Sequence, residues 1–440
     1  MTRFTGGSRL LERIFHLSEN NTSVRQELLA GLTTFMTMAY VVVVNPRILS
    51  EAGMPVDGVL FATCISAALA TLVMGLWANY PIALAPGMSL NAYFTYSIVL
   101  QRGVPWQTAL GVVLLSGILF LILTLTNIRE QIVNGIPDCL KYGTAAGIGL
   151  FIAFVGFRNA GIIVANSSTF VALGKTSDPQ VILAAVGVVL IAILMARRVG
   201  SAILLGIIII TLVGIPLKVS HLPAHFFSWP HPSGTLFKLD VRSAAKIGLG
   251  ELVFVFFFVD LFDNVGTLVG VCEQGGFMRD GKLPRASRAL LADAFGTIVG
   301  ALTGTSTVTS YIESAAGVTA GARTGMGNLL IAALFVGAMF CAPIVSAIPS
   351  YATAPALILV GALMCGEVAK VKWSDYTEAV PAFLTVIGTP LTFSIATGLS
   401  MGLLSFTFMK LFTGRHKEIS PLIWVLSALF LLRYAFLSHE

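Results

Sequence analysis

The chain has 440 residues, of which 56% are hydrophobic and only 11% charged, with a formal net charge of +6. Soluble domains carry about 25% charged residues, so the composition excludes a soluble enzyme, a fibrous protein and a disordered chain. Apolar runs recur from residue 28 almost to the end, and one membrane crossing needs roughly 20 apolar residues. We therefore predict an all-α polytopic membrane protein rather than a barrel of alternating strands.

Candidate spans form two groups on either side of a polar outside loop at 218–247. Seven crossings in each half would place the halves in opposite orientations, so we expect two inverted repeats at 28–217 and 248–413. A cytoplasmic segment at 1–27 precedes them, and a segment at 414–440 contains a further apolar stretch at 421–437, either interfacial or an extra span. The predicted spans are 28–44, 58–77, 81–100, 107–126, 144–164, 180–196, 201–217, 248–271, 286–303, 305–320, 326–347, 352–366, 379–393 and 395–412.

Lysine and arginine concentrate in short connectors, including those at 1–27, 279–288 and 410–417. Positive charge on the inside sets the orientation of membrane helices. The excess of basic residues therefore reflects the orientation of the helices in the cytoplasmic membrane, and we expect no nucleic-acid partner. The first 27 residues lack an apolar segment before a cleavage site, so we expect no removable signal peptide.

Few other motifs carry chemistry. The five cysteines form no CxxC pair and mostly lie in or beside spans, as small buried hydrophobic residues do. The six histidines lie outside the main spans, and the HExxH signature is absent. We predict neither a metal site nor a cofactor.

The third segment of each half is irregular. The first carries Pro81, Pro86 and Gly87 in mid-span, and the second, 304–317, is rich in Thr, Ser and Val. Proline breaks the helical hydrogen-bond ladder, and a β-branched run favours extended backbone. Matched interruptions in two halves indicate the binding site of a transporter. Two proline-kinked structural helices are the alternative interpretation.

Acidic residues inside spans are the sharpest signal. Asp260 and Asp263 are three residues apart and share one face of the eighth span, where Asn264 and Thr267 extend a polar stripe. Glu313 lies in the tenth segment. Each ionised acid at mid-bilayer costs roughly 2.5–3.5 kcal/mol, and three together cost an amount comparable to a protein's whole stability.

Such a cost indicates function. Before the C-terminal stretch we expect only one basic residue at span depth, Arg158 near the end of the fifth span, so a set of buried salt bridges with these acids is not available. Three neighbouring carboxyls also do not all ionise together. A carboxyl that gains a proton outside and loses it inside is what a proton symporter needs. A carboxylate only accepts hydrogen bonds, which suits the ring N–H groups of a heterocycle. The alternative is a neutral carboxylic acid bonded within the bundle.

The sequence resembles a known family in several motifs that occur in the same order. They are Gly31-Leu-Thr-Thr-Phe-Met-Thr-Met-Ala-Tyr40, Ala85-Pro-Gly-Met-Ser-Leu-Asn-Ala-Tyr93, Leu261-Phe-Asp-Asn-Val-Gly-Thr-Leu268 and Gly304-Thr-Ser-Thr-Val-Thr-Ser-Tyr-Ile-Glu-Ser-Ala-Ala-Gly317. In this combination the chain is similar to the AzgA-like purine permeases of the second nucleobase–cation symporter family.

The resemblance implies a fourteen-helix fold of core and gate domains, with short strands in segments three and ten. It implies import of adenine, guanine or hypoxanthine with protons, by movement of the core against the gate. Asp263 and Glu313 are the residues predicted to couple transport to protons. The predicted substrate-binding residues are Asn91, Asp260, Glu313, Ser89, Ile312 and Ser314.

Two other function classes stay open at this point. An anion transporter of the same architecture would use helix dipoles at the broken segments, although three cavity acids oppose a negative substrate. A membrane-embedded enzyme would need a nucleophile–base pair that the sequence does not offer. The resemblance also leaves open a homodimer, because dimers occur in this fold.

Overall fold

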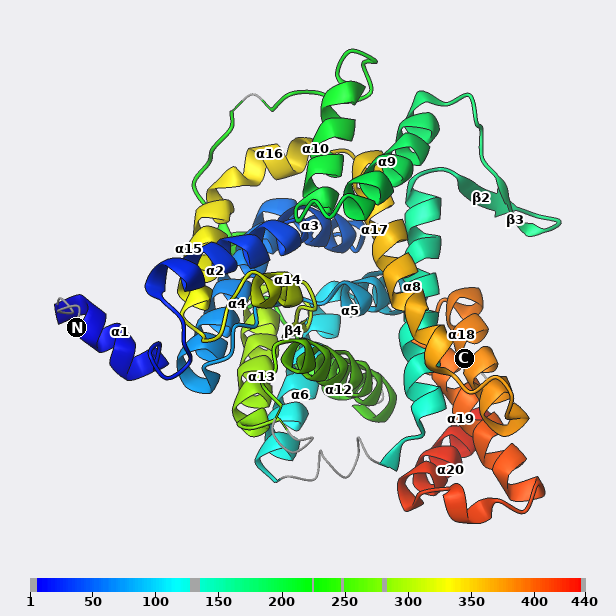
Figure 1. The fold of residues 1–440 in the computed structure, drawn as a ribbon. Coiled ribbons are helices and arrows are strands. Elements are labelled where there is room, and N and C mark those ends of the chain that lie inside the picture. The colour runs from blue at the N-terminus through cyan, green and yellow to red at the C-terminus, as the bar shows by residue number, and fades with distance from the viewer. Residues whose placement is uncertain (1–5, 127–134, 224, 247–248, 279–282, 437–440) are drawn as a thin grey trace. The chain divides into compact units, whose positions relative to one another are not determined.

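A computed structural model of the chain describes residues 6–126, 135–223, 225–246, 249–278 and 283–436. It is predominantly helical (Figure 1) and contains two compact units. Unit 1 comprises 1–125 and 176–353, and unit 2 comprises 126–175 and 354–440. Each unit combines segments from both halves of the sequence. Residues 1–5 and 279–282 of the predicted inside connectors lie outside the described ranges.

Within the described residues, nine helical segments are long and apolar enough to cross a membrane. This confirms the prediction of a polytopic helical membrane protein, whereas the total of fourteen crossings stays a prediction. The nine segments are Val24–Glu51, Val56–Ala78, Trp106–Leu125, Asp138–Asn159, Pro179–Ala196, Glu251–Gln274, Gly327–Ala347, Ser350–Lys370 and Ile395–Phe412.

Unit 1 contains most of the helices and one pair of strands. Its elements are α1 (Gly6–Phe15), α2 (Val24–Met38), α3 (Val41–Glu51), α4 (Val56–Val73), the π-helical turn η1 (Met74–Ala78), β1 (Leu84–Pro86), α5 (Met88–Ala92), the π-helix η2 (Tyr93–Gln101), α6 (Trp106–Leu125), α9 (Pro179–Ala196), α10 (Ala202–Gly214), η3 (Pro232–Gly234), α11 (Val241–Lys246), α12 (Leu249–Gln274), α13 (Ala286–Thr303), β4 (Val308–Ser310), α14 (Ser314–Thr319), α15 (Gly327–Ala338), η4 (Met339–Cys341) and α16 (Ala342–Ala347).

Unit 2 contains a helical bundle and a hairpin. The helix α17 (Ser350–Cys365) begins in unit 1 and continues into unit 2. Its other elements are α8 (Asp138–Asn159), β2 (Ile163–Asn166), β3 (Phe170–Leu173), η5 (Gly366–Lys370), α18 (Tyr376–Thr392), α19 (Ile395–Phe412), η6 (His416–Glu418) and α20 (Pro421–Phe436).

The β2–β3 hairpin corrects one predicted boundary. The span expected at 144–164 ends as a helix at Asn159, because Gly161 takes a left-handed backbone with φ of 68°. The backbone N–H of Gly161 then bonds the Arg158 carbonyl, which closes the last helical turn. Beyond it, the Asn166 side chain accepts from the N–H groups of Ser168 and Thr169 and forms the turn of the hairpin.

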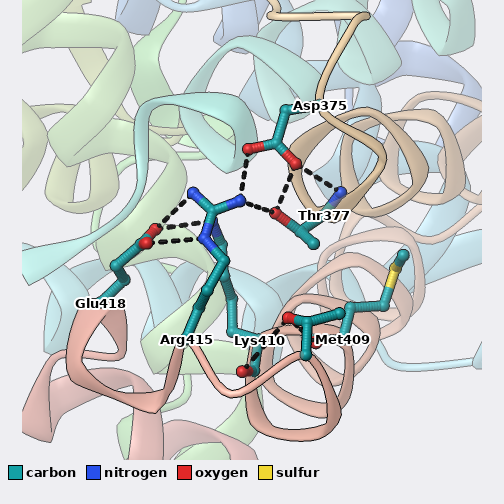
Figure 2. A network of polar contacts seen from close by, with 7 residues as sticks. Asp375, Thr377, Met409, Lys410, Arg415 and Glu418 are labelled. Atoms are coloured by element: carbon teal, nitrogen blue, oxygen red, sulfur yellow. Dashed lines mark hydrogen bonds and ion pairs between the residues drawn. The ribbon is translucent and has the colours of Figure 1, made fainter.

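A network of charges joins the ends of α18 and α19 in unit 2 (Figure 2). Arg415 Nη1 lies 2.7 Å from Asp375 Oδ2, and its Nε lies 2.6 Å from Glu418 Oε1. Lys410, only 1% exposed on α19, places Nζ 2.7 Å from Glu418 Oε2. Lys410, which belongs to the predicted inside connector at 410–417, is thus buried at the end of α19, where Glu418 compensates its charge.

These contacts act on the carboxyls at the ends of the helices. Hydrogen bonds from the Thr377 hydroxyl and then the Arg415 guanidinium hold the pKa of Asp375 well below its usual range. Hydrogen bonds from Arg415 and then Lys410 lower the pKa of Glu418 to about 2. Because both folded-state values are depressed, their stabilisation is present above the unfolded carboxyl values near pH 4 and is lost as pH falls through the folded ones.

We predict that Arg415→Gln lowers the melting temperature of the detergent-solubilised protein by a few degrees at pH 6. The deficit should shrink as pH falls from 4 toward 2, since the same carboxyls then protonate in the wild type. Thermal unfolding across this pH range provides the measurement, with exposed Arg242→Gln as the matched control. A deficit that does not vary with pH would contradict the ionic origin of the effect.

Candidate functional site

Two short strands, far apart in sequence, pair in unit 1. β1 and β4 are antiparallel, with Leu84 opposite Ser310 and Pro86 opposite Val308. All of their residues are buried. This confirms the predicted strands in the third and tenth segments. Their pairing satisfies backbone groups that a broken helix would leave exposed to hydrocarbon.

Each strand is also held by a threonine from the helix before it. Thr71 on α4 both donates to the Leu84 carbonyl (3.0 Å) and accepts from the Leu84 N–H (2.9 Å). Thr297 on α13 makes the same two contacts with Val308, each at 3.2 Å. Both hydroxyls therefore bridge the donor and the acceptor of one strand residue.

A short helix follows each strand, α5 after β1 and α14 after β4. The helix α12, which carries two of the predicted acids, packs against β4, α14 and α5. The arrangement brings the third, eighth and tenth predicted segments together in one part of unit 1 (Figure 1). The candidate site residues lie on α5, α12 and α14 or, for Ile312 and Glu313, in the turn between β4 and α14.

Asp263 and Ser89 contact each other directly. The Ser89 hydroxyl donates to Asp263 Oδ2 at 3.3 Å, which connects α5 to α12. Among the described residues, Asp263 Oδ1 accepts no hydrogen bond, and the side chain is only partly buried. Asp263 thus has one oxygen held by the protein and one open to a ligand.

Glu313 shows the same division. Its Oε1 accepts from the Tyr40 hydroxyl at 2.8 Å, its carboxylate also interacts with its own backbone N–H, and no other residue in the described part of the chain donates to Oε2. Glu313 is half-buried at the start of α14. Tyr40 was not predicted as a site residue, although it closes the first of the recognised motifs, because sequence spacing does not show that it meets a residue 273 positions away.

Two further predicted binding residues, Asp260 and Asn91, are fully buried. Asp260 is 0% exposed on α12, and Asn264, one turn later, is also 0% exposed with no partner for either amide atom among the described residues. The Asn91 amide oxygen accepts from the Ser306 hydroxyl, and its Nδ2 has no partner in the described structure. Asn91 and Asp260 are therefore buried, whereas Asp263 and Glu313 are partly exposed.

Of the remaining predicted binding residues, Ser314 has a structural role and Ile312 is accessible. The Ser314 hydroxyl accepts from the Ala83 N–H at 3.0 Å and extends the strand pairing. Ile312 is 54% exposed beside Glu313, so its side chain is accessible to a ligand. The aromatic residues nearby are core: Tyr93 packs edge-on against Phe256, and Phe257 against Phe120.

Within the described residues, no group of three His, Cys, Asp or Glu side chains could hold a metal ion. The polar side chains of the candidate site are carboxylates, hydroxyls and amides, which are suited to hydrogen bonding with a neutral polar molecule.

Comparison with known proteins shows the family of this chain. The sequence profile of the Permease family matches residues 25–402. The chain belongs to this family. It is 46% identical to a guanine/hypoxanthine permease, PbuO, of Bacillus subtilis, over 96% of this chain and 99% of that protein. It is 41% identical to an adenine permease, AdeP, of Escherichia coli, over 99% of this chain and 98% of that one.

The solved structures support the fold. The transmembrane domain of a cyanobacterial bicarbonate transporter, BicA, matches with a TM-score of 0.64 and 15% identity, over 86% of this chain and 97% of that one. At that identity the likeness concerns the fold alone. Family membership and the apolar helices together identify this permease as a multi-pass protein of the cell membrane.

The Ser306–Asn91 contact gives a test of the interior. Ser306→Ala should reduce the free energy of unfolding by about 1–3 kcal/mol, because it leaves a buried amide oxygen without a donor. Ser310→Ala is the matched control, since that buried hydroxyl on β4 has no partner among the described residues. Denaturation of both purified variants provides the comparison, and equal losses would show that the Asn91 contact is not stabilising.

Proposed function

We propose that this permease imports purine nucleobases, namely adenine, guanine or hypoxanthine, together with protons. The observation that carries the proposal is similarity along nearly the entire chain to permeases named for these bases. Two acids with one open oxygen each, on elements that meet at the paired strands, suit the ring N–H and amino donors of a purine.

In the proposed cycle, Asp263 or Glu313 takes a proton from outside. A purine then binds Glu313, Asn91 and Asp260, and the core segments move against the gate segments to release both inside. The structural likeness to a bicarbonate transporter does not favour an anion, because carboxylates at the site would repel it.

The inverted repeat belongs to the same proposal. Thr71 and Thr297 precede their strands by 13 and 11 residues and make the same pair of contacts. Two halves of common origin would place these threonines at equivalent positions. The equivalent contacts support a repeat between the two halves.

Uptake of labelled adenine, hypoxanthine and guanine by a strain deficient in purine transport tests the substrate. Expression of this chain should restore uptake of at least one base, and competition by unlabelled purines should rank the others. If the protein is present in the membrane and uptake of all three stays at background, the proposed substrate class is wrong.

Glu313→Gln tests the role of that acid, since the amide has a similar shape but cannot ionise. We expect at least a tenfold loss of purine uptake, or uptake that no longer responds to external pH. Glu273→Gln, exposed at the last turn of α12, is the matched control. Unchanged uptake at every pH would remove Glu313 from both proposed roles.

A further inference from the structure

Tyr40 occupies the junction of α2 and α3, where the first predicted span changes from one helix to the next. Its side chain is 2% exposed, and its hydroxyl is directed at the Glu313 carboxylate, 2.8 Å from Oε1. A hydrogen bond to a charged acceptor is about twice as strong as a neutral one. The junction therefore makes a specific contact with the acid proposed to bind the purine.

The packing of α2 against α14, here called the seam, keeps the Tyr40–Glu313 contact in place. Thr37, one helical turn before Tyr40, donates to the Thr34 carbonyl at 2.7 Å and approaches the Glu313 carbonyl at 3.4 Å. Further along, α2 and α14 touch so closely that a Cβ on Gly317 would lie 2.0 Å from Thr34 Oγ1. The seam thus fixes the backbone on both sides of the Tyr40–Glu313 bond.

At the other end of the seam, buried Glu27 accepts from the backbone N–H groups of Arg323 and Thr324, at 2.9 and 3.2 Å. This joins the start of α2 to the segment that follows α14. The Tyr40 hydroxyl is therefore held between two packed segments, and the direction of its O–H bond is set by the fold.

We propose that Tyr40 is a positioning residue for transport: it holds Glu313 Oε1 so that Oε2 faces the purine. The proposal rests on the proposed function. Tyr40 does not itself contact substrate in this account; it acts through the carboxylate.

The same bond bears on protonation. The titratable groups that face Glu313 are Tyr40 from the α2–α3 junction, Tyr311 from the end of β4 and Asp263 from α12. A phenol that donates to Oε1 favours the ionised carboxylate over the protonated one.

Tyr40→Phe removes the hydroxyl and keeps the ring. We expect the KM for the transported purine to rise about three- to tenfold, and the pH profile of uptake to change. A loss of packing alone would lower the amount of protein without moving the pH profile.

Tyr351→Phe is the matched control. Tyr351 is also 2% exposed in unit 1, but its hydroxyl has no hydrogen-bond partner among the described residues. This variant should retain the wild-type KM and pH profile. In a Glu313→Gln background, Tyr40→Phe should produce no further change in the pH profile, because the group through which it acts can no longer ionise.

The outcomes separate the two hypotheses. Absence of purine uptake by the wild type overturns the proposed function. Wild-type purine uptake with an unchanged KM and pH profile in Tyr40→Phe overturns the role of Tyr40 and leaves the function standing. If wild-type uptake does not respond to pH, proton coupling fails, and the KM of Tyr40→Phe still decides whether Tyr40 positions Glu313.

Discussion

Non-helical backbone at membrane depth needs hydrogen-bond partners within the protein, and the rest of the site depends on how this chain supplies them. β1 and β4 satisfy each other, and Thr71 and Thr297 each satisfy both backbone groups of one strand residue. Because the strands interrupt two helices at this position, α5 and α14 each begin shortly after a buried strand. The acids and amides of the site lie on or beside the elements that this pairing holds together.

The two partly exposed acids, Asp263 and Glu313, are held in the same way. Ser89 holds one oxygen of Asp263, and Tyr40 holds one oxygen of Glu313. A carboxylate with one fixed oxygen loses little rotational freedom when a ligand binds the other, so less of the binding energy is spent on ordering it. The hydroxyls also make it less costly to keep a charge away from bulk water. Transport in this account uses the open oxygens, and the held ones keep the geometry.

The sequence was sufficient for the helical class and both broken segments, because composition, proline positions and β-branched runs are local signals. It also placed Asp263 and Glu313 on elements that the fold brings together. It could not show that Ser306 meets Asn91 or that Tyr40 meets Glu313, since a single sequence contains no signal for contacts between residues more than 200 positions apart. It missed the β2–β3 hairpin because an apolar run resembles a helix and a strand equally. The ion pair of the buried Lys410 could not be predicted, because its partner, Glu418, lies beyond the end of its helix.

The central claim is that a heterocycle and a proton use the same carboxyls in turn. Proteoliposomes that contain only this permease and an internal pH indicator test it most directly, with potassium and valinomycin present to remove any membrane potential. Addition of a transported purine outside should acidify the interior at a rate that follows purine entry. Purine entry that leaves the internal pH unchanged, or that requires a sodium gradient, would contradict the account.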